Sequence, residues 1–375
     1  MIKISSTVLS ISMAAVMVCV GSFPVQAAET SPSSEELNQK LEELQVETEI
    51  ISDNVENLEE ILSKGLNVSG YMDVEYIVDD REGKVDGFRI HHFSLFLQKK
   101  LHKNWSVFSE LEFEDAPFFE AGGSKELSRS EGKILLEQVY ADYHATPNMT
   151  LRGGRFLTPA GIWNINHYPP FVTTQSRPLH IRNIFPQYLD GLELSGSVNI
   201  HDYMLSYSGY AANGGGNPGS GDQNEDKAFG GRLEFNAPLM VELKIGVSAL
   251  NDKLNDGTEK TATGADLQLN ISALKIQAEY ATADMKPGEG QTYGMQGYYV
   301  QALTNLGMWT FFGRYDYFNE NDTIADNGVF VSTGGLNYHW TPTVVSKIEA
   351  NYFDYQNEEV SVDHTVWILS LSVFF

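Results

Sequence analysis

Residues 309–317 read Trp-Thr-Phe-Phe-Gly-Arg-Tyr-Asp-Tyr, and their alternation indicates the fold class. Its odd-numbered positions carry Trp, Phe, Gly, Tyr and Tyr, which share one face of an extended strand. The other face carries the polar residues Thr310, Arg314 and Asp316. A strand with lipid on one side and water on the other needs this alternation.

The same period of two continues outward in both directions, from Leu66 to Phe375. The alternating stretches are about ten residues long, which is the length of a tilted strand that crosses a bilayer. Short links such as 236–238, 272–273 and 304–306 alternate with long polar links such as 283–291. The sequence therefore predicts an all-β transmembrane fold: an antiparallel, up-and-down outer-membrane β-barrel of about 16 strands over residues 66–375. A soluble β-sandwich is the alternative, but it gives no reason for the regular change of loop length.

The N-terminal 64 residues follow different patterns. Residues 1–27 have a basic start, an apolar middle and a small-residue end, which predicts a secretory signal peptide cut after Ala27, or else after Ala28. A retained membrane anchor is the alternative for this segment. Residues 28–64 are acidic, and apolar positions repeat there in steps of four and three, which predicts a short periplasmic coiled-coil helix. The seam positions are Leu37, Leu41, Leu44, Thr48, Ile51, Val55, Leu58 and Leu62.

Composition excludes several classes of function. The chain has 50 acidic and 25 basic residues, a net charge of −25, so it is a poor partner for nucleic acid. One cysteine, Cys19 in the predicted leader, excludes a disulfide framework. Nucleophile-elbow and phosphate-loop motifs are missing, and His167 and His180 lack a third histidine at ligand spacing. We expect no enzyme activity, no catalytic residues, no metal site and no cofactor.

One long connection, residues 157–189, differs from the polar loops. It is rich in proline, histidine and aromatic residues, a composition that argues for a folded segment. Long loops that keep such a composition are usually functional. We expect this segment to fold into the barrel and constrict its lumen, since a barrel of about 16 strands otherwise encloses a wide channel. An external cap or a contact between trimer subunits is the alternative.

The polar faces of the predicted strands indicate what lines this lumen. Alternation places side chains of both signs there: Glu110, Glu112, Arg232, Lys275, Arg314 and Lys347. The densest basic group consists of Arg177 and Arg182 in the long segment and Arg152 and Arg155 before it. Because guanidinium binds carboxylate and phosphate in a bidentate manner, these four arginines form a candidate anion site at the constriction. Ion pairs that anchor the loop to Glu110, Glu112 and Glu137 are the alternative.

Three stretches in the first half carry a family resemblance. Residues 108–114 read Phe-Ser-Glu-Leu-Glu-Phe-Glu, residues 136–143 read Leu-Glu-Gln-Val-Tyr-Ala-Asp-Tyr, and residues 151–164 read Leu-Arg-Gly-Gly-Arg-Phe-Leu-Thr-Pro-Ala-Gly-Ile-Trp-Asn. They resemble the phosphate-selective porin O and P superfamily of bacterial outer-membrane porins. The motif likeness covers residues 105–196, and the rest resembles these porins only in its alternation. The resemblance implies a trimeric 16-stranded barrel and a passive channel, but it does not carry over phosphate selectivity.

The combined prediction is a homotrimeric porin of the bacterial outer membrane. It would contact outer-membrane lipid and let small hydrophilic solutes and ions diffuse, with a possible preference for phosphate or carboxylate anions. The alternative is a structural or adhesive barrel that tethers the envelope through its coiled coil. The position of residues 157–189, inside the barrel wall or outside it, separates the two functions.

Overall fold

The computed structural model describes residues 40, 44–48, 51, 55, 65–116, 132–214, 224–238, 241–357 and 361–375. The chain divides into two units, residues 1–60 and 61–375. The predicted signal peptide and most of the predicted coiled coil lie outside the described residues. Residues 44–48 are helical, and the side chains of Leu44 and Ile51 are exposed. Among the described residues, no helix has both the length and the apolar character needed to cross a membrane.

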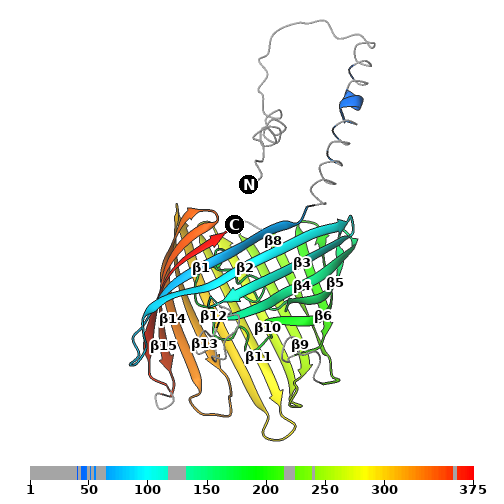
Figure 1. The fold of residues 1–375 in the computed structure, drawn as a ribbon. Coiled ribbons are helices and arrows are strands. Elements are labelled where there is room, and N and C mark those ends of the chain that lie inside the picture. The colour runs from blue at the N-terminus through cyan, green and yellow to red at the C-terminus, as the bar shows by residue number, and fades with distance from the viewer. Residues whose placement is uncertain are drawn as a thin grey trace, which may run out of the picture. The chain divides into compact units, whose positions relative to one another are not determined.

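Sixteen strands of the described chain form one closed antiparallel barrel, in which each strand pairs with its neighbours in sequence and β1 pairs with β16 (Figure 1). The predicted barrel and its strand number are confirmed. The strands are β1 Asn67–Asp79, β2 Gly87–His102, β3 Trp105–Glu114, β4 Lys133–Thr146, β5 Met149–Leu157, β6 Tyr188–Ile200, β7 Tyr203–Ala212, β8 Ala228–Pro238, β9 Glu242–Lys253, β10 Glu259–Ile271, β11 Leu274–Lys286, β12 Tyr293–Leu306, β13 Trp309–Asn319, β14 Gly328–Thr341, β15 Val344–Tyr355 and β16 His364–Phe374.

Burial alternates along the strands as the sequence pattern predicts. On β12, Val300 is 49% exposed while the next residue, Gln301, is buried. Val300 lies opposite Tyr315 of β13, which is 45% exposed, and Gln301 lies opposite the buried Arg314. Residues directly opposite in an antiparallel ladder share a face. The outward face is therefore apolar and aromatic, and the inward face is polar.

The barrel closes where β1 meets β16. The backbone N–H of Gly70 donates to the Phe375 carbonyl at 2.8 Å, and the Phe375 N–H donates to the Gly70 carbonyl at 2.9 Å. The Phe375 ring stacks on Phe93 of β2, with ring centroids 6.0 Å apart. These contacts continue the ladder beyond the last residue of β16 and leave no strand edge unpaired in the described sheet.

Two predicted links prove to be strand. Residues 236–238, expected as a turn, belong to β8, and Pro238 lies opposite Glu242 of β9. Residues 304–306 likewise belong to β12, and Leu306 lies opposite Trp309. Proline is tolerated at the end of a strand because it removes only one ladder hydrogen bond there.

Candidate functional site

Residues 158–187, here called the inner loop, join β5 to β6 and form hydrogen bonds with inward side chains of β11, β13 and β15. The second half of the inner loop contributes Ile184 and Phe185 to a buried apolar cluster. The wall side of this cluster combines small and large side chains. The small ones are Ala212, Ala228, Ala262, Ala281 and Ala283, and the larger ones are Phe156, Leu189, Tyr210, Leu250, Met285 and Met295. Small inward side chains leave the room that the loop fills, so hydrophobic burial holds this half in place.

A tight turn attaches the start of the inner loop to β11. Gly161 has a φ of +63°, and a Cβ at this position would lie 1.9 Å from Oε2 of Glu279. The Trp163 backbone N–H donates to Oε1 of Glu279 at 2.9 Å, and the Tyr299 hydroxyl donates to the same oxygen at 2.8 Å. Glycine is needed here because it accepts the left-handed backbone and lets the carboxylate approach closely.

Charged wall residues hold the middle of the inner loop. The Lys347 ammonium, from β15, donates to the backbone carbonyls of Pro169 at 2.7 Å and Val172 at 2.8 Å. The Arg314 guanidinium, from β13, donates to the Ser176 carbonyl at 2.8 Å and to the Thr174 hydroxyl. Both side chains are buried. These two predicted lumen residues therefore act on the loop backbone instead of facing an open channel.

Three carboxylates complete the attachment of the loop tip, residues 173–176. Glu349 of β15 accepts the backbone N–H of Gln175 at 2.6 Å and that of Ser176 at 3.0 Å. The Gln175 side-chain amide donates to Asp73 and Glu75 of β1, at 2.7 Å each. Gln175 and Ser176 are thus hydrogen-bonded to β15 on one side of β16 and to β1 on the other side.

The remaining predicted acidic residues lie where β3 and β4 face the inner loop. Glu110 accepts the Gln138 amide at 2.8 Å, and Glu112 accepts the Tyr71 hydroxyl at 2.7 Å. Glu137 contacts His167 of the inner loop, with 3.3 Å between Nε2 and the carboxylate. The three carboxylates, Glu110, Glu112 and Glu137, are buried and lie within 4.8 Å of one another.

The structure does not bring the four predicted arginines into one group. Arg152 forms ion pairs with Asp142 at 2.8 Å and Glu193 at 3.4 Å on the inner wall. Arg155 forms a bidentate pair with Asp190, at 2.6 and 2.8 Å. It lies opposite Val139, which is 40% exposed, and so shares the outward face of the barrel.

Arg177 and Arg182 differ from the first two arginines because neither has an ion-pair partner among the described residues. Nη1 of Arg177 is buried without a hydrogen-bond partner in the described structure. Burial, followed by the charge of Arg182, lowers the pKa of Arg177 to about 10. Arg177 remains cationic at neutral pH, and both side chains lie near the carboxylate of Glu137.

The other two predicted lumen residues lie on the wall away from the loop contacts described above. Arg232 is buried and donates to Asp266 at 2.5 and 2.9 Å and to Glu234 at 2.9 Å. Lys275 is half-buried on β11, on the same face as Gln277 and Glu279. This part of the lumen wall therefore carries charges of both signs, and Arg232 is paired with two carboxylates.

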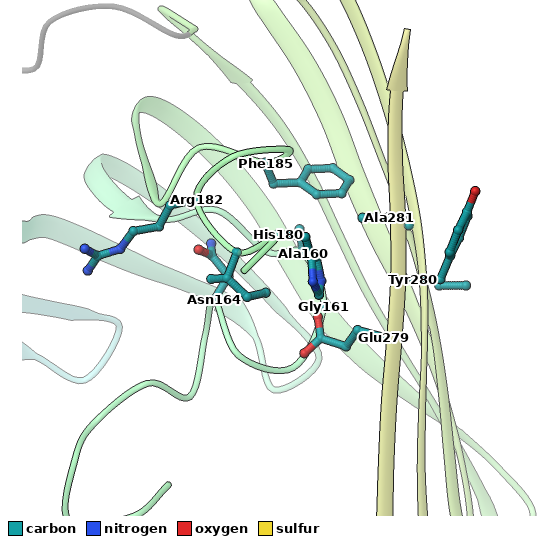
Figure 2. A pocket seen from close by; sticks show the side chains of 12 residues that line it. Ala160, Gly161, Asn164, His180, Arg182, Phe185, Glu279, Tyr280 and Ala281 are labelled. Atoms are coloured by element: carbon teal, nitrogen blue, oxygen red, sulfur yellow. The ribbon is translucent and has the colours of Figure 1, made fainter. Parts of the chain in front are cut away.

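His180 of the inner loop lines a small pocket together with Ala160, Phe185 and Glu279 (Figure 2). Its ring stacks on Tyr299 with centroids 6.0 Å apart, and neither ring nitrogen has a hydrogen-bond partner in the described structure. Burial, followed by the charge of Arg314, lowers the pKa of His180 to about 4. The adjoining cavity has a volume of about 20 Å³. It holds about one water molecule, so it is too small to be a solute pathway.

Sequence reasoning missed the most densely bonded residues of the inner loop. Gln175 bonds to carboxylates 100 and 102 positions away in sequence, and Ser176 bonds to Asn351, 175 positions away. Neither residue type has a local signature. The only signal was the composition of the whole segment, which indicates that it is folded but not which residues touch the wall.

The sequence matches a known family along most of its length. Residues 65–373 match the family model described as "Putative beta-barrel porin-2, OmpL-like". A protein of Aquifex aeolicus (strain VF5), described as uncharacterized, is 30% identical over 195 residues, covering 52% of this chain and 40% of that protein. The chain therefore spans about two fifths of the length of this curated relative.

Solved structures share the fold. The anion-selective porin from Comamonas acidovorans has a TM-score of 0.59 and 13% identity, covering 83% of this chain and 99% of that one. A loop-deleted OmpT, an outer membrane protein of Vibrio cholerae, has a TM-score of 0.59 and 11% identity with the same coverage. OmpF of Salmonella typhi has a TM-score of 0.57 and 11% identity, covering 83% and 97%. At these identities the likeness shows the fold alone.

The porin resemblance inferred from residues 105–196 is confirmed, and the family model that matches is that of β-barrel porin-2. The closed 16-stranded barrel and its porin neighbours agree with this family. The chain therefore belongs to the OmpL-like β-barrel porin-2 family and is a porin barrel of the outer-membrane type.

Proposed function

We propose that the protein is a passive diffusion channel of the bacterial outer membrane, with no enzymatic activity. The observation that carries this proposal is the attachment of the inner loop to the inward wall by Arg314, Lys347, Glu349 and Glu279. A loop fixed at this position narrows a barrel that would otherwise be wide. The inner loop then sets the size limit for small hydrophilic solutes.

Planar-bilayer recording with the purified full-length protein tests channel function. We expect discrete conductance steps that scale with the salt concentration, because ions cross a water-filled passage. A preparation of folded barrels that gives no steps at any voltage would reject the diffusion channel and favour the structural tether.

The proposal extends to a preference for anions at the inner loop. Arg177 and Arg182 supply cationic groups without ion-pair partners among the described residues, whereas Arg152 and Arg155 are neutralised by neighbouring carboxylates. Guanidinium groups that are not paired can bind phosphate or carboxylate. One similar structure, from Comamonas acidovorans, is described as an anion-selective porin. We therefore assign the selectivity to Arg177 and Arg182.

Reversal potentials in a KCl gradient test this assignment. We expect the wild-type channel to favour chloride over potassium, and the double variant Arg177→Ala/Arg182→Ala to lose most of this preference. Arg155→Ala is the matched control, because its outward-facing ion pair with Asp190 should leave the lumen unchanged. An unchanged reversal potential in the double variant would reject the assignment.

We also propose that the segment 28–64 forms a coiled coil and that the protein is a homotrimer. Leu44, Ile51 and Val55 of the predicted seam are exposed in the structure, which suits a helix that packs on other copies. OmpT of Vibrio cholerae has a solved structure described as a trimer form. Sedimentation of the full chain and of a variant lacking residues 28–64 tests both points, since loss of the helix should lower the stability of the trimer.

A further inference from the structure

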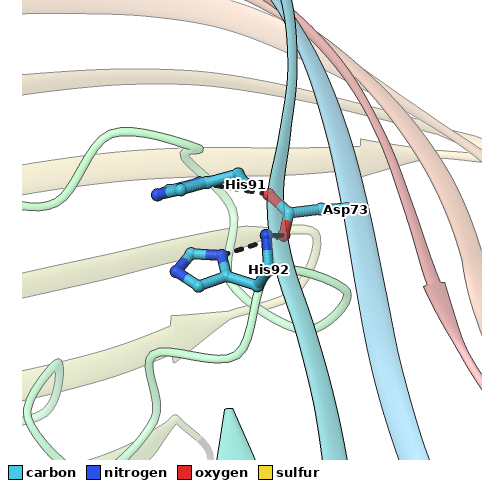
Figure 3. A group of neighbouring side chains, drawn as sticks. All are labelled: Asp73, His91 and His92. Carbon is cyan, nitrogen blue, oxygen red and sulfur yellow. Dashed lines mark hydrogen bonds and ion pairs between the residues drawn. The ribbon is translucent and has the colours of Figure 1, made fainter. Parts of the chain in front are cut away.

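We propose that the barrel wall carries a binding site for one divalent transition-metal ion, of the Zn²⁺ class, formed by Asp73, His91 and His92 (Figure 3). One potential ligand atom from each residue lies within 4.8 Å of the other two. This site was not foreseen from the sequence, which led us to expect no metal. It does not depend on the proposed channel function.

A β-bulge brings the two histidines together. In the β1–β2 ladder, Asp73 lies opposite His92 and Val74 lies opposite Ile90, so His91 is an extra residue in β2. A bulge re-aims the side chain of the extra residue. Neighbouring residues of a regular strand point to opposite faces, yet here both imidazoles contact the inward-facing carboxylates of β1.

The ligand distances fit a small divalent ion. Nδ1 of His92 is 2.9 Å from Oδ1 of Asp73, and Nδ1 of His91 is 3.3 Å from Oδ2 of Asp73. Nδ1 of His91 is also 2.9 Å from Oε1 of Glu75, which makes Glu75 a candidate fourth ligand. With metal–ligand distances of about 2.0–2.1 Å, a tetrahedral zinc site separates its ligands by about 3.3 Å. The three nitrogen–oxygen separations, 3.3, 2.9 and 2.9 Å, lie within about 0.4 Å of that value.

The charges of the group also favour a metal ion. The His91 and His92 ring centroids are 3.6 Å apart, and the carboxylates of Asp73 and Glu75 lie against the ring nitrogens. A divalent ion bound by these groups would be balanced by the two carboxylates. Imidazole with carboxylate is a ligand set suited to zinc and its neighbours, and not to magnesium or calcium.

The inner loop supplies the outer contacts of the site. The Gln175 amide donates to Asp73 and to Glu75 and thereby orients both carboxylates. Groups that orient metal ligands typically change metal affinity 10- to 100-fold when they are removed. The site thus joins the bulged β-strand to the tip of the inner loop, and a bound ion would hold this junction together.

Titration of the untagged, full-length protein in detergent micelles with ZnCl₂ tests the site, with calorimetry for affinity and elemental analysis after dialysis for stoichiometry. We expect one tightly bound Zn²⁺ per chain in the wild type and at least about tenfold weaker binding in His91→Gln/His92→Gln. His144→Gln and His339→Gln are matched controls, because these histidines bond to threonines away from the site. Equal binding by the wild type and the double variant would overturn the proposal and leave the imidazoles as ion-pair partners of Asp73.

Further variants guard against a folding defect. If the double variant does not form a barrel, the single variants His92→Gln and Asp73→Asn replace it in the test. Unchanged Zn²⁺ affinity in both single variants would reject the site. Gln175→Leu should keep one Zn²⁺ per chain but bind it about 10- to 100-fold more weakly. With Co²⁺ in place of Zn²⁺, visible absorption from imidazole coordination should appear in the wild type and vanish in His92→Gln.

Discussion

His180 shows how one side chain makes the inner loop sensitive to pH. Its ring is buried against Tyr299, and burial lowers its pKa from 6.5 to about 4. Between pH 6.5 and 4, His180 is therefore protonated in the unfolded chain, where its pKa is ordinary, but stays neutral in the folded chain. The stability due to neutral His180 is fully present above pH 6.5 and is lost as the pH falls toward 4.

This linkage predicts the behaviour of His180→Leu. Between pH 7 and pH 4, the wild type should lose about 3 kcal/mol of unfolding free energy through this group, whereas the variant should lack this component. Urea denaturation in micelles across this pH range measures the difference. All other titrating groups are common to both proteins and cancel in the comparison. Parallel pH profiles for the wild type and the variant would contradict the assignment.

At the scale of the element, the inner loop is a folded part of the barrel and depends on a few wall residues. Lys347 is 1% exposed and satisfies two loop carbonyls, those of Pro169 and Val172. Lys347→Met removes both hydrogen bonds and leaves buried carbonyls unpaired, at a cost of about 1–3 kcal/mol each. We expect a noisier and larger conductance and faster proteolysis within residues 169–176.

A second lysine provides the control for this variant. Lys275→Met removes a half-buried inward lysine of β11 that makes none of the loop contacts described above. Its conductance distribution and its cleavage rate should match those of the wild type. If Lys347→Met also matched the wild type in both measurements, Lys347 would not be an anchor of the inner loop.

The elements differ in how far the sequence could predict them. Strands such as β13 were predictable because apolar and polar residues alternate along them, and this alternation indicates which face contacts water. The inner loop could be recognised by its composition, but its contacts could not, because Gln175 meets Asp73 only after the barrel closes. The bulge at His91 was hidden for a related reason. A pair of adjacent histidines breaks the alternation, but only the ladder of β1 and β2 shows where the extra residue lies.

At the scale of the whole molecule, the barrel separates an apolar outer surface from a largely polar interior. Val300 lies near the middle of β12, is 49% exposed and faces outward opposite Tyr315. An arginine at position 300 would have to be buried in lipid or extend to the membrane–water interface. In a bilayer, a lipid-facing arginine costs about 2–4 kcal/mol near the midplane and less than about 1 kcal/mol near the interfaces.

Val300→Arg should therefore lower the unfolding free energy by about 2–4 kcal/mol when the protein is folded into phospholipid vesicles and denatured with urea. Val85→Arg is the control, because Val85 is 92% exposed in the link between β1 and β2, outside the strands. A penalty at position 300 with no penalty at position 85 requires lipid against the outer face. Equal effects at both positions would mean that water, and not lipid, surrounds the barrel wall, and the proposed placement in the membrane would then be wrong.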